Sequence, residues 1–390
     1  MADWQTPWRQ AKERTAEQYG RHVGQSVGAL PTPALIVDAA ALERNISVMA
    51  AAMAGQVAQL RPHTKVQKSP DLALLQLAAG AIGVTVASVW EAAAMAAGGV
   101  PDILIANQVV PPEKVAAVAA LAGHVNLTVA VDDVRNIDAL SVALTRRGTE
   151  AGALVELDVG MARCGARSGP EALALAERVH AAPGLQLKGI QAYEGHCMLE
   201  PDRQRRIQLA TEAMEYAASV KVLLRGAGLP AGTLSGGGTG TYDITGSNPE
   251  VTELQAGSYV FMDAFHGNLV PGFEVSLTTL TTVIARHGNT VILDAGRKSI
   301  GIDFVLPRLH GYDYVARYFA EEHALFEVDD RFSADYGQKV RLVSGYAPTT
   351  VNLHDVIFVI RDDQVTEVWP VFPRGPGHCG FLSSLGPGLP

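Results

Sequence analysis

The sequence has few of the features that mark secreted, membrane-spanning or nucleic-acid-binding proteins. Its 390 residues include three cysteines, an odd number without close spacing, so neither a disulfide framework nor a CxxC zinc site is expected. The 31 Lys and Arg residues against 40 Asp and Glu residues leave no basic surface for nucleic-acid phosphates. Apolar runs stay well short of the ~20 residues of a membrane helix, and no secretory signal is visible at the N-terminus. We therefore expect a cytoplasmic protein with reduced thiols that binds neither nucleic acid nor membranes.

The sequence does have the composition and periodicity of a large folded core. Hydrophobic residues make up 48% of the chain and charged residues 18%, a balance typical of globular proteins. Short β-branched runs alternate with Ala- and Leu-rich helical stretches, which is typical of βαβ units. About eight strands are expected, and eight regular units favour a (β/α)8 TIM barrel over a doubly wound sheet, which is the alternative. The expected strands are Gln59–Lys65, Gly83–Ser88, Asp102–Asn107, Asn126–Asp132, Ala153–Asp158, Leu187–Tyr193, Thr233–Gly236 and Glu253–Phe261.

The pattern changes near residue 272, where period-two alternation without long helices begins. This alternation predicts a C-terminal antiparallel β domain. We expect an N-terminal extension over residues 1–29, an α/β barrel over 30–271 and the β domain over 272–390. The early run 34–37 precedes the first barrel helix, and we expect it to join the β domain.

Polar or glycine-rich segments follow several of the predicted strands. Active sites of eight-stranded parallel barrels lie at these carboxyl ends. In the segment after the seventh strand, Ser235–Tyr242, three consecutive glycines let the backbone approach an anion closely, and Thr239 and Thr241 add hydroxyl donors. The segment matches neither a P-loop nor a dinucleotide fingerprint. It predicts a phosphate site, and the alternative is a flexible turn.

Lys65 ends the first predicted strand, close to Arg61 and His63. Neighbouring cations lower the pKa of an ammonium group, and a neutral lysine can attack a carbonyl to form a Schiff base. The alternative is an ordinary surface lysine. A reactive lysine and a phosphate loop in one barrel mouth together indicate pyridoxal phosphate.

These residues resemble the motifs of a known enzyme family. Arg61–Lys65 (RPHTK) is similar to the RPHxK motif of the D-threonine aldolase and D-serine dehydratase family, whose barrel is of the alanine racemase type. The resemblance extends over about residues 30–375, and its other motifs include DVGMARCG at 158–165, QAYEG at 191–195, GGGTGTY at 236–242, LQAGSYVFMD at 254–263 and VNLHD at 351–355.

The resemblance implies a role for each matching residue. Lys65 would hold pyridoxal 5'-phosphate as a Schiff base and then act as acid and base at the substrate α-carbon. Arg163 would face the phenolic oxygen of the cofactor, although a salt bridge to Glu156 or Asp158 is the alternative. Tyr193 would lie against the ring nitrogen. The residues implied for cofactor binding are Lys65, Arg163, Tyr193, Ser235, Gly237, Gly238, Thr239 and Tyr242.

The sequence departs from the family at its metal site. Members usually carry a His-x-Cys or His-x-Asp pair before the VNL run, whereas this chain has Tyr346 and Pro348 in those positions. Proline offers no ligand and neutral tyrosine is a poor one, so the usual divalent metal site is expected to be absent. His354 with Asp355, or His378 with Cys379, are the alternatives for a substitute site.

Without the usual metal pair, protein groups must activate the substrate. Glu194, His196 and His266 are candidates for this acid or base, since imidazole titrates near neutrality. The candidate catalytic residues are Lys65, His63, His196 and His266.

The expected function is that of a lyase cleaving a D-configured β-hydroxy amino acid to glycine and an aldehyde. The alternatives are a metal-independent dehydratase, a racemase or epimerase, and a non-catalytic pyridoxal phosphate carrier. The resemblance also implies a homodimer with its active sites at the subunit interface.

Overall fold

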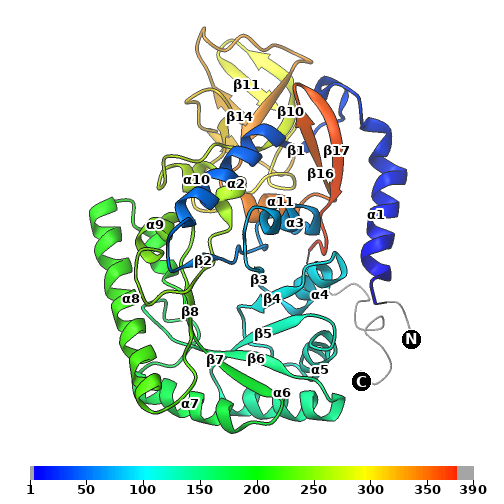
Figure 1. Cartoon of the computed structure of the whole chain (residues 1–390). Coiled ribbons are helices and arrows are strands. Elements are labelled where there is room, and N and C mark those ends of the chain that lie inside the picture. The colour runs from blue at the N-terminus through cyan, green and yellow to red at the C-terminus, as the bar shows by residue number, and fades with distance from the viewer. Residues whose placement is uncertain (1–3, 376–390) are drawn as a thin grey trace.

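Two sheets organise the chain in the computed structural model, which describes residues 4–375 (Figure 1). One sheet is an eight-stranded parallel barrel, and the other is a nine-stranded, mostly antiparallel sheet beside it. The predicted combination of a TIM barrel with an antiparallel β domain is confirmed.

The barrel strands follow one another around the ring in the order β2-β9-β8-β7-β6-β5-β4-β3. The ring closes where the segment after β2 meets β3: the Thr64 amide donates to the Thr85 carbonyl at 2.8 Å, and the Thr85 amide donates to the Pro62 carbonyl at 2.9 Å. The barrel strands are β2 (Gln59–Leu60), β3 (Val84–Val86), β4 (Asp102–Ile105), β5 (Asn126–Val131), β6 (Ala151–Glu156), β7 (Leu185–Ala192), β8 (Thr233–Gly236) and β9 (Glu253–Leu254).

Two barrel strands are much shorter than the sequence predicts. β2 ends at Leu60, and the chain then leaves regular pairing through Pro62, which has no amide hydrogen for a ladder. β9 ends at Leu254, and a short 3₁₀ turn follows at Ser258–Val260. Both shortened strands therefore give way to loops at the barrel mouth, and one of these loops carries Lys65.

Helices cover the outside of the barrel, and local capping fixes several of their ends. The Asp133 carboxylate accepts from the Arg135 amide at the start of α6, and Gly148 ends that helix with φ of 70°. All nine residues of α4 (Val89–Ala97) are buried, because α1 (Thr6–Tyr19) and the neighbouring barrel elements pack around it. The other helices of the barrel and its mouth are α2 (Ala39–Met53), α3 (Pro70–Ala78), α4 (Val89–Ala97), α5 (Pro112–Leu121), α6 (Val134–Arg147), α7 (Gly169–Ala181), α8 (Arg203–Gly226), α9 (Tyr242–Thr245) and α10 (Ala264–Gly267).

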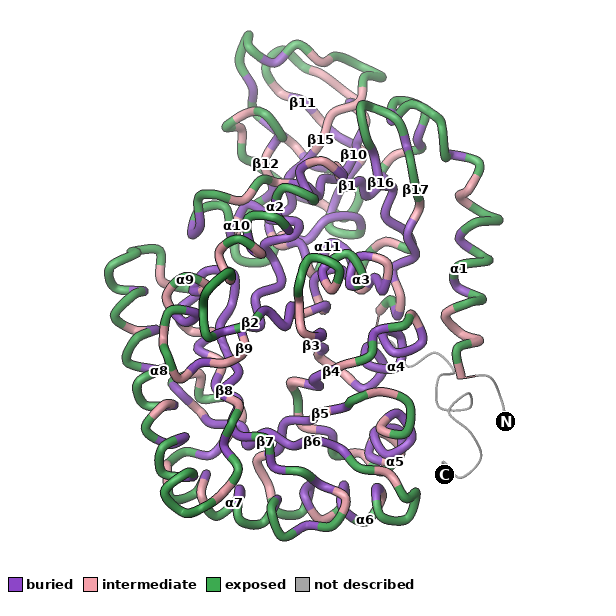
Figure 2. Tube along the Cα trace, in the orientation of Figure 1, coloured by how far each residue is buried: buried purple, intermediate pink, exposed green. Residues whose placement is uncertain are grey.

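The second sheet joins the two ends of the described chain. β1 (Ala34–Asp38) lies in its middle, antiparallel to β10 (Leu277–His287) and parallel to β16 (Val356–Arg361). The interiors of both sheets are buried (Figure 2). The remaining strands are β10 (Leu277–His287), β11 (Thr290–Leu293), β12 (Arg308–Leu309), β13 (Tyr318–Phe319), β14 (Ala324–Glu327), β15 (Lys339–Val343), β16 (Val356–Arg361) and β17 (Gln364–Pro370), and α11 (Ala347–Asn352) connects β15 to β16.

None of the helices in residues 4–375 is both long enough and apolar enough to cross a membrane.

Candidate functional site

A cavity of about 580 Å³ lies at the carboxyl ends of the barrel strands. Loops after most of the barrel strands contribute to it, and so do Phe304 and Tyr346 from the C-terminal part of the chain. We call one part of its wall the barrel side, made of Lys65, Arg163, Tyr193, Gly237, Gly238 and Thr239. We call another part the aromatic side, made of Phe265, His266, Phe304 and Tyr346.

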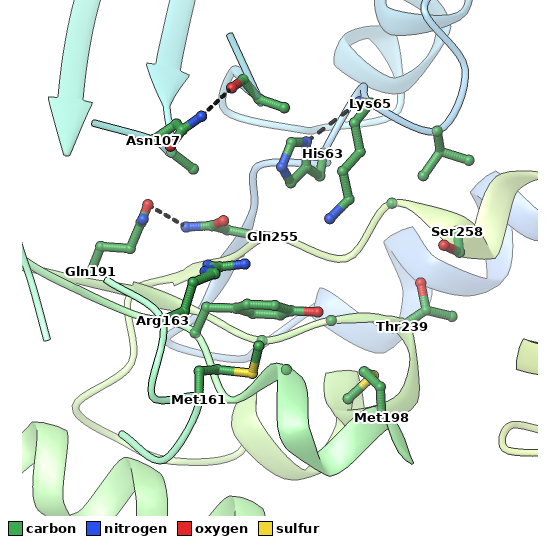
Figure 3. Close-up of a pocket in the computed structure, with 18 of the residues that line it drawn as sticks. His63, Lys65, Asn107, Met161, Arg163, Gln191, Met198, Thr239, Gln255 and Ser258 are labelled. Atoms are coloured by element: carbon green, nitrogen blue, oxygen red, sulfur yellow. Dashed lines mark hydrogen bonds between the residues drawn. The ribbon is translucent and has the colours of Figure 1, made fainter. Parts of the chain in front are cut away.

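Lys65 lies in the loop after β2, and Figure 3 shows its amine pointing into the cavity. Burial, and then the Arg163 cation, lower the pKa of the Lys65 ammonium. No ion pair of Lys65 occurs within residues 4–375, whereas Lys68 lies 3.2 Å from the Glu91 carboxylate. Lys65 is therefore a half-buried lysine that lines the cavity and has no counter-ion among residues 4–375, and it is not the surface lysine that was the alternative.

Arg163 and Lys65 both lie over the ring of Tyr193. The Arg163 Cζ atom is 5.7 Å, and the Lys65 Nζ atom 5.8 Å, from the ring centroid. The alternative role for Arg163, a salt bridge, is not seen in the described part of the chain, because Arg167 pairs with Asp158 instead. Arg163 is left facing the cavity (Figure 3).

The glycine-rich loop after β8 is folded around the buried carboxylate of Glu194. This carboxylate accepts from the Gly237 amide at 3.0 Å, from the Thr241 hydroxyl at 2.7 Å and from the Thr245 hydroxyl. Gly237 has φ of 76°, and a Cβ there would lie 2.3 Å from Leu254, so only glycine fits. Glu194 thus supports the loop and does not line the cavity, although the sequence had made it a candidate acid or base.

The loop brings only some of its predicted residues to the cavity. Gly237, Gly238 and Thr239 line it. Ser235 is buried behind the wall, where its hydroxyl accepts from the Gln255 amide at 2.9 Å. Tyr242 packs its ring on Phe273, away from the lining.

The three candidate histidines differ in position. His63 lines the cavity, and burial, with Lys65 beside it, holds its pKa well below the usual range. His196 is not among the lining residues; its ring packs against Gly160, where an added Cβ would lie 2.8 Å away. His266 lines the cavity, and its Nδ1 atom is 2.9 Å from the Asp263 carboxylate.

The residues at the family's metal positions do not form a ligand set. Tyr346 lines the cavity, but burial raises the pKa of its phenol to about 12, so it is neutral at physiological pH. Pro348 lies in the first turn of α11 and has no side-chain donor. Within residues 4–375, no group of three or more His, Cys, Asp or Glu side chains could hold a metal ion.

The substitute sites do not supply such a set either. His354 is 2.7 Å from the Ser299 carbonyl, and Asp355 pairs with Arg374. His378 and Cys379 lie outside the described residues.

Sequence reasoning missed a polar network in the cavity wall. The Gln255 side-chain amide donates to Gln191 at 3.0 Å (Figure 3), and the Gln191 side-chain amide donates to Glu156. Burial raises the pKa of Glu156 to about 8, so this carboxyl is mostly protonated at neutral pH. All three residues lie at or near strand ends, which is the signal that could have identified them.

Comparisons with known proteins agree with this geometry. The alanine racemase N-terminal domain family matches residues 37–264, and the serine dehydratase domain family matches residues 276–360. D-threonine aldolase of an Arthrobacter species is 38% identical, covering 90% of this chain and 95% of the relative. The 3-hydroxy-D-aspartate aldolase of Paracoccus denitrificans is 37% identical, covering 92% of this chain and 98% of the relative.

A solved structure gives the same result. The crystal structure of D-threonine aldolase from Filomicrobium marinum superposes with a TM-score of 0.87 at 34% identity, covering 90% of this chain and 97% of that chain. Alanine racemase of Clostridium difficile, at 11% identity and a TM-score of 0.69, shares the fold. The chain therefore belongs to the alanine racemase-type family that contains D-threonine aldolase and 3-hydroxy-D-aspartate aldolase, and it is a lyase of the aldolase type.

Proposed function

We propose that this enzyme uses pyridoxal 5'-phosphate to cleave a D-configured β-hydroxy amino acid to glycine and an aldehyde. One observation carries the proposal: Lys65, a half-buried amine with no counter-ion in the described part of the chain, shares a cavity with Arg163, Tyr193 and a glycine-rich loop in a chain of the aldolase family. The cytoplasmic location and the homodimer stay predictions.

The residues of the barrel side fit the cofactor. Gly237, Gly238 and Thr239 would hold its phosphate, since a loop without side chains at two positions lets amides approach an anion. Arg163, which has no ion pair within residues 4–375, would face the phenolic oxygen. Ser235 and Tyr242, which the sequence also predicts to bind the cofactor, lie behind the cavity wall, where Ser235 contacts Gln255 and Tyr242 packs on Phe273. When bound, pyridoxal phosphate supplies an electron sink for the pair released as the Cα–Cβ bond breaks.

The chain's own groups prepare the site for this chemistry. The lowered pKa of Lys65 increases the fraction of neutral amine, which is the form that attacks a carbonyl and accepts a proton from the α-carbon, and it makes the ammonium form a better donor when the proton is returned. Burial raises the pKa of Tyr193, so the phenol stays neutral and would add no charge at the ring nitrogen of the bound cofactor. His63 is held neutral by the same burial and so does not compete with Lys65 for a proton.

The aromatic side favours a substrate with an apolar β-substituent. Phe265 and Phe304 stack with ring centroids 4.6 Å apart, and Tyr346 meets Phe304 edge-on at 5.0 Å. The only lysine and arginine among the described lining residues are Lys65 and Arg163, which the cofactor would engage. A second substrate carboxylate would therefore lack a cationic partner.

The test is product analysis with purified holoenzyme and D-threonine or D-phenylserine. We expect aldehyde and glycine in equal amounts from the D-substrates, no product from the L-enantiomers, and faster release of benzaldehyde than of acetaldehyde. A 2-oxo acid as the main product would identify a dehydratase, and accumulation of the α-epimer would identify a racemase or epimerase. Either result would refute the aldolase proposal.

A further inference from the structure

His266 is held in place by a carboxylate that also fixes the neighbouring wall of the cavity. Asp263 accepts from the His266 amide at 2.8 Å and pairs with His266 Nδ1 at 2.9 Å through the same oxygen. Its other oxygen accepts from the Ala347 amide at 2.8 Å. Because Ala347 directly follows Tyr346, the fully buried Asp263 ties α10 to the start of α11.

This arrangement sets the orientation of the imidazole. Nδ1 faces a carboxylate, which accepts hydrogen bonds, so in the neutral imidazole Nδ1 carries the ring proton and Nε2 keeps the lone pair. His266 Nε2 has no hydrogen-bond partner within residues 4–375, and His266 lines the cavity. The Tyr346 ring lies nearly parallel to the imidazole, at 18° with centroids 5.9 Å apart, and restricts its rotation.

Tyr346 occupies the position where the family usually has a metal ligand. A neutral phenol and Pro348 do not fit a divalent cation, so this chain needs another group to take the proton of the β-hydroxyl. An imidazole oriented by a carboxylate is the usual protein solution to that need.

We propose that His266, oriented by Asp263 and packed against Tyr346, is the base that removes the β-hydroxyl proton, and that cleavage proceeds without a divalent metal. The inference rests on the aldolase function proposed above. The O–H bond breaks and its proton goes to His266 Nε2, while the oxygen electron pair forms the aldehyde C=O bond. The Cα–Cβ bond breaks, its electron pair remains with the α-carbon fragment, and the α-carbon takes a proton from Lys65 to give glycine. Nε2 then returns its proton to solvent, and Lys65 regains one.

The key experiment separates the β-hydroxyl step from the α-carbon step. His266→Asn keeps an N–H that can donate to Asp263 but removes Nε2. We expect the variant to release benzaldehyde from D-phenylserine with kcat lower by about 10²- to 10⁴-fold, the range for one acid–base group, and KM within about threefold. It should still exchange the α-hydrogen of glycine with D₂O at the wild-type rate, because that reaction has no β-hydroxyl. His180→Asn, the same change at an exposed histidine of α7, is the matched control and should leave both rates unchanged.

The metal is tested on the wild-type holoenzyme. We expect aldehyde release to persist after dialysis against a strong chelator, and added Mn²⁺ to change it by less than about twofold. Loss of release with the chelator and recovery with Mn²⁺ would overturn the inference while leaving the aldolase function intact.

Three other outcomes would also overturn it. One is unchanged aldehyde release in His266→Asn. Another is parallel loss of both rates, which would indicate a structural role. The third is that His196→Asn, and not His266→Asn, loses aldehyde release while it retains exchange of the glycine α-hydrogen. A wild-type protein that releases no aldehyde at all would refute the proposed function itself.

Discussion

The barrel side and the aromatic side of the cavity are built in different ways. The barrel side consists of loops that each follow one strand, and their shape is fixed locally, as in the Gly237 loop around Glu194. The aromatic side brings Phe265, Phe304 and Tyr346 together from segments that are up to 81 residues apart, and contacts between these segments hold them, including the hydrogen bond from the Ala347 amide to Asp263. The first side consists of residues that match motifs of the family, whereas the second side has Tyr346 at a position where the family usually has a metal ligand. This contrast indicates that the cofactor half of the site can stay constant while the half that meets the substrate β-carbon changes.

The strongest test of the barrel side is Lys65→Ala. Because the residue would serve both as the covalent anchor and as the acid–base group at the α-carbon, aldehyde release should fall by at least about 10⁴-fold, the upper end of the range for one acid–base group. The visible absorbance of the purified protein should be lost as well. Both changes are read directly by spectrophotometry.

Lys68→Met provides the matched control. This lysine lies three residues away but pairs with Glu91, so its loss should lower stability and leave the visible absorbance in place. A yellow and active Lys65→Ala protein would refute the assignment of the barrel side.

The second test concerns Glu156 in the cavity wall. Burial raises its pKa from 4.5 to about 8, so the folded state binds a proton that the unfolded state releases above pH 4.5. The contribution of Glu156 to the free energy of unfolding is therefore fully present below pH 4.5. It decreases as the pH rises toward 8, by up to about 1.4 kcal/mol per pH unit. In Glu156→Gln, which keeps an acceptor for Gln191, this loss should disappear.

The measurement is the difference in free energy of unfolding between the two proteins from pH 5 to pH 9. The variant should gain a few kcal/mol over the wild type at the alkaline end. A difference that does not depend on pH would show that Glu156 does not titrate in this range.

The third test asks whether Glu194 determines the shape of the phosphate loop. Glutamine offers one acceptor oxygen where the carboxylate offers two. In Glu194→Gln the side-chain NH₂ group, which is a donor, would therefore face either the Gly237 N–H or the threonine hydroxyls, which are donors as well. We expect a loss of about 1–3 kcal/mol in unfolding free energy and weaker cofactor binding. Calorimetry and cofactor titration measure the two effects.

Glu215→Gln, on the exposed face of α8, is the comparison and should shift stability by less than about 0.5 kcal/mol. Unchanged stability and cofactor affinity in Glu194→Gln would mean that the loop keeps its shape without this carboxylate.

How far the sequence predicts each side follows from this difference in construction. Eight strand periods and a lysine beside two basic residues are local signals, so the barrel, Lys65 and the glycine loop could be identified. Sequence spacing does not distinguish a polar residue that lines the cavity from one that lies just behind the lining. For this reason Ser235 and Tyr242 were expected in the lining. Phe304 lies in a loop with no motif, and only the folded chain brings it to the cavity.

The fourth and smallest effect is expected at Phe304 on the aromatic side. The residue is 60% exposed and its backbone φ is 64°, yet its ring stacks on that of Phe265 with centroids 4.6 Å apart. In Phe304→Ala the ratio of kcat/KM for D-phenylserine to that for D-threonine should fall about 2- to 10-fold, since an aromatic pair contributes about 0.5–1.5 kcal/mol beyond burial. Tyr336→Ala, at an aromatic residue 77% exposed and outside the lining, should leave the ratio unchanged. An equal decrease in kcat/KM for both substrates would instead show that Phe304 maintains the shape of the aromatic side as a whole. Only contact with the β-substituent can lower kcat/KM for one substrate more than for the other.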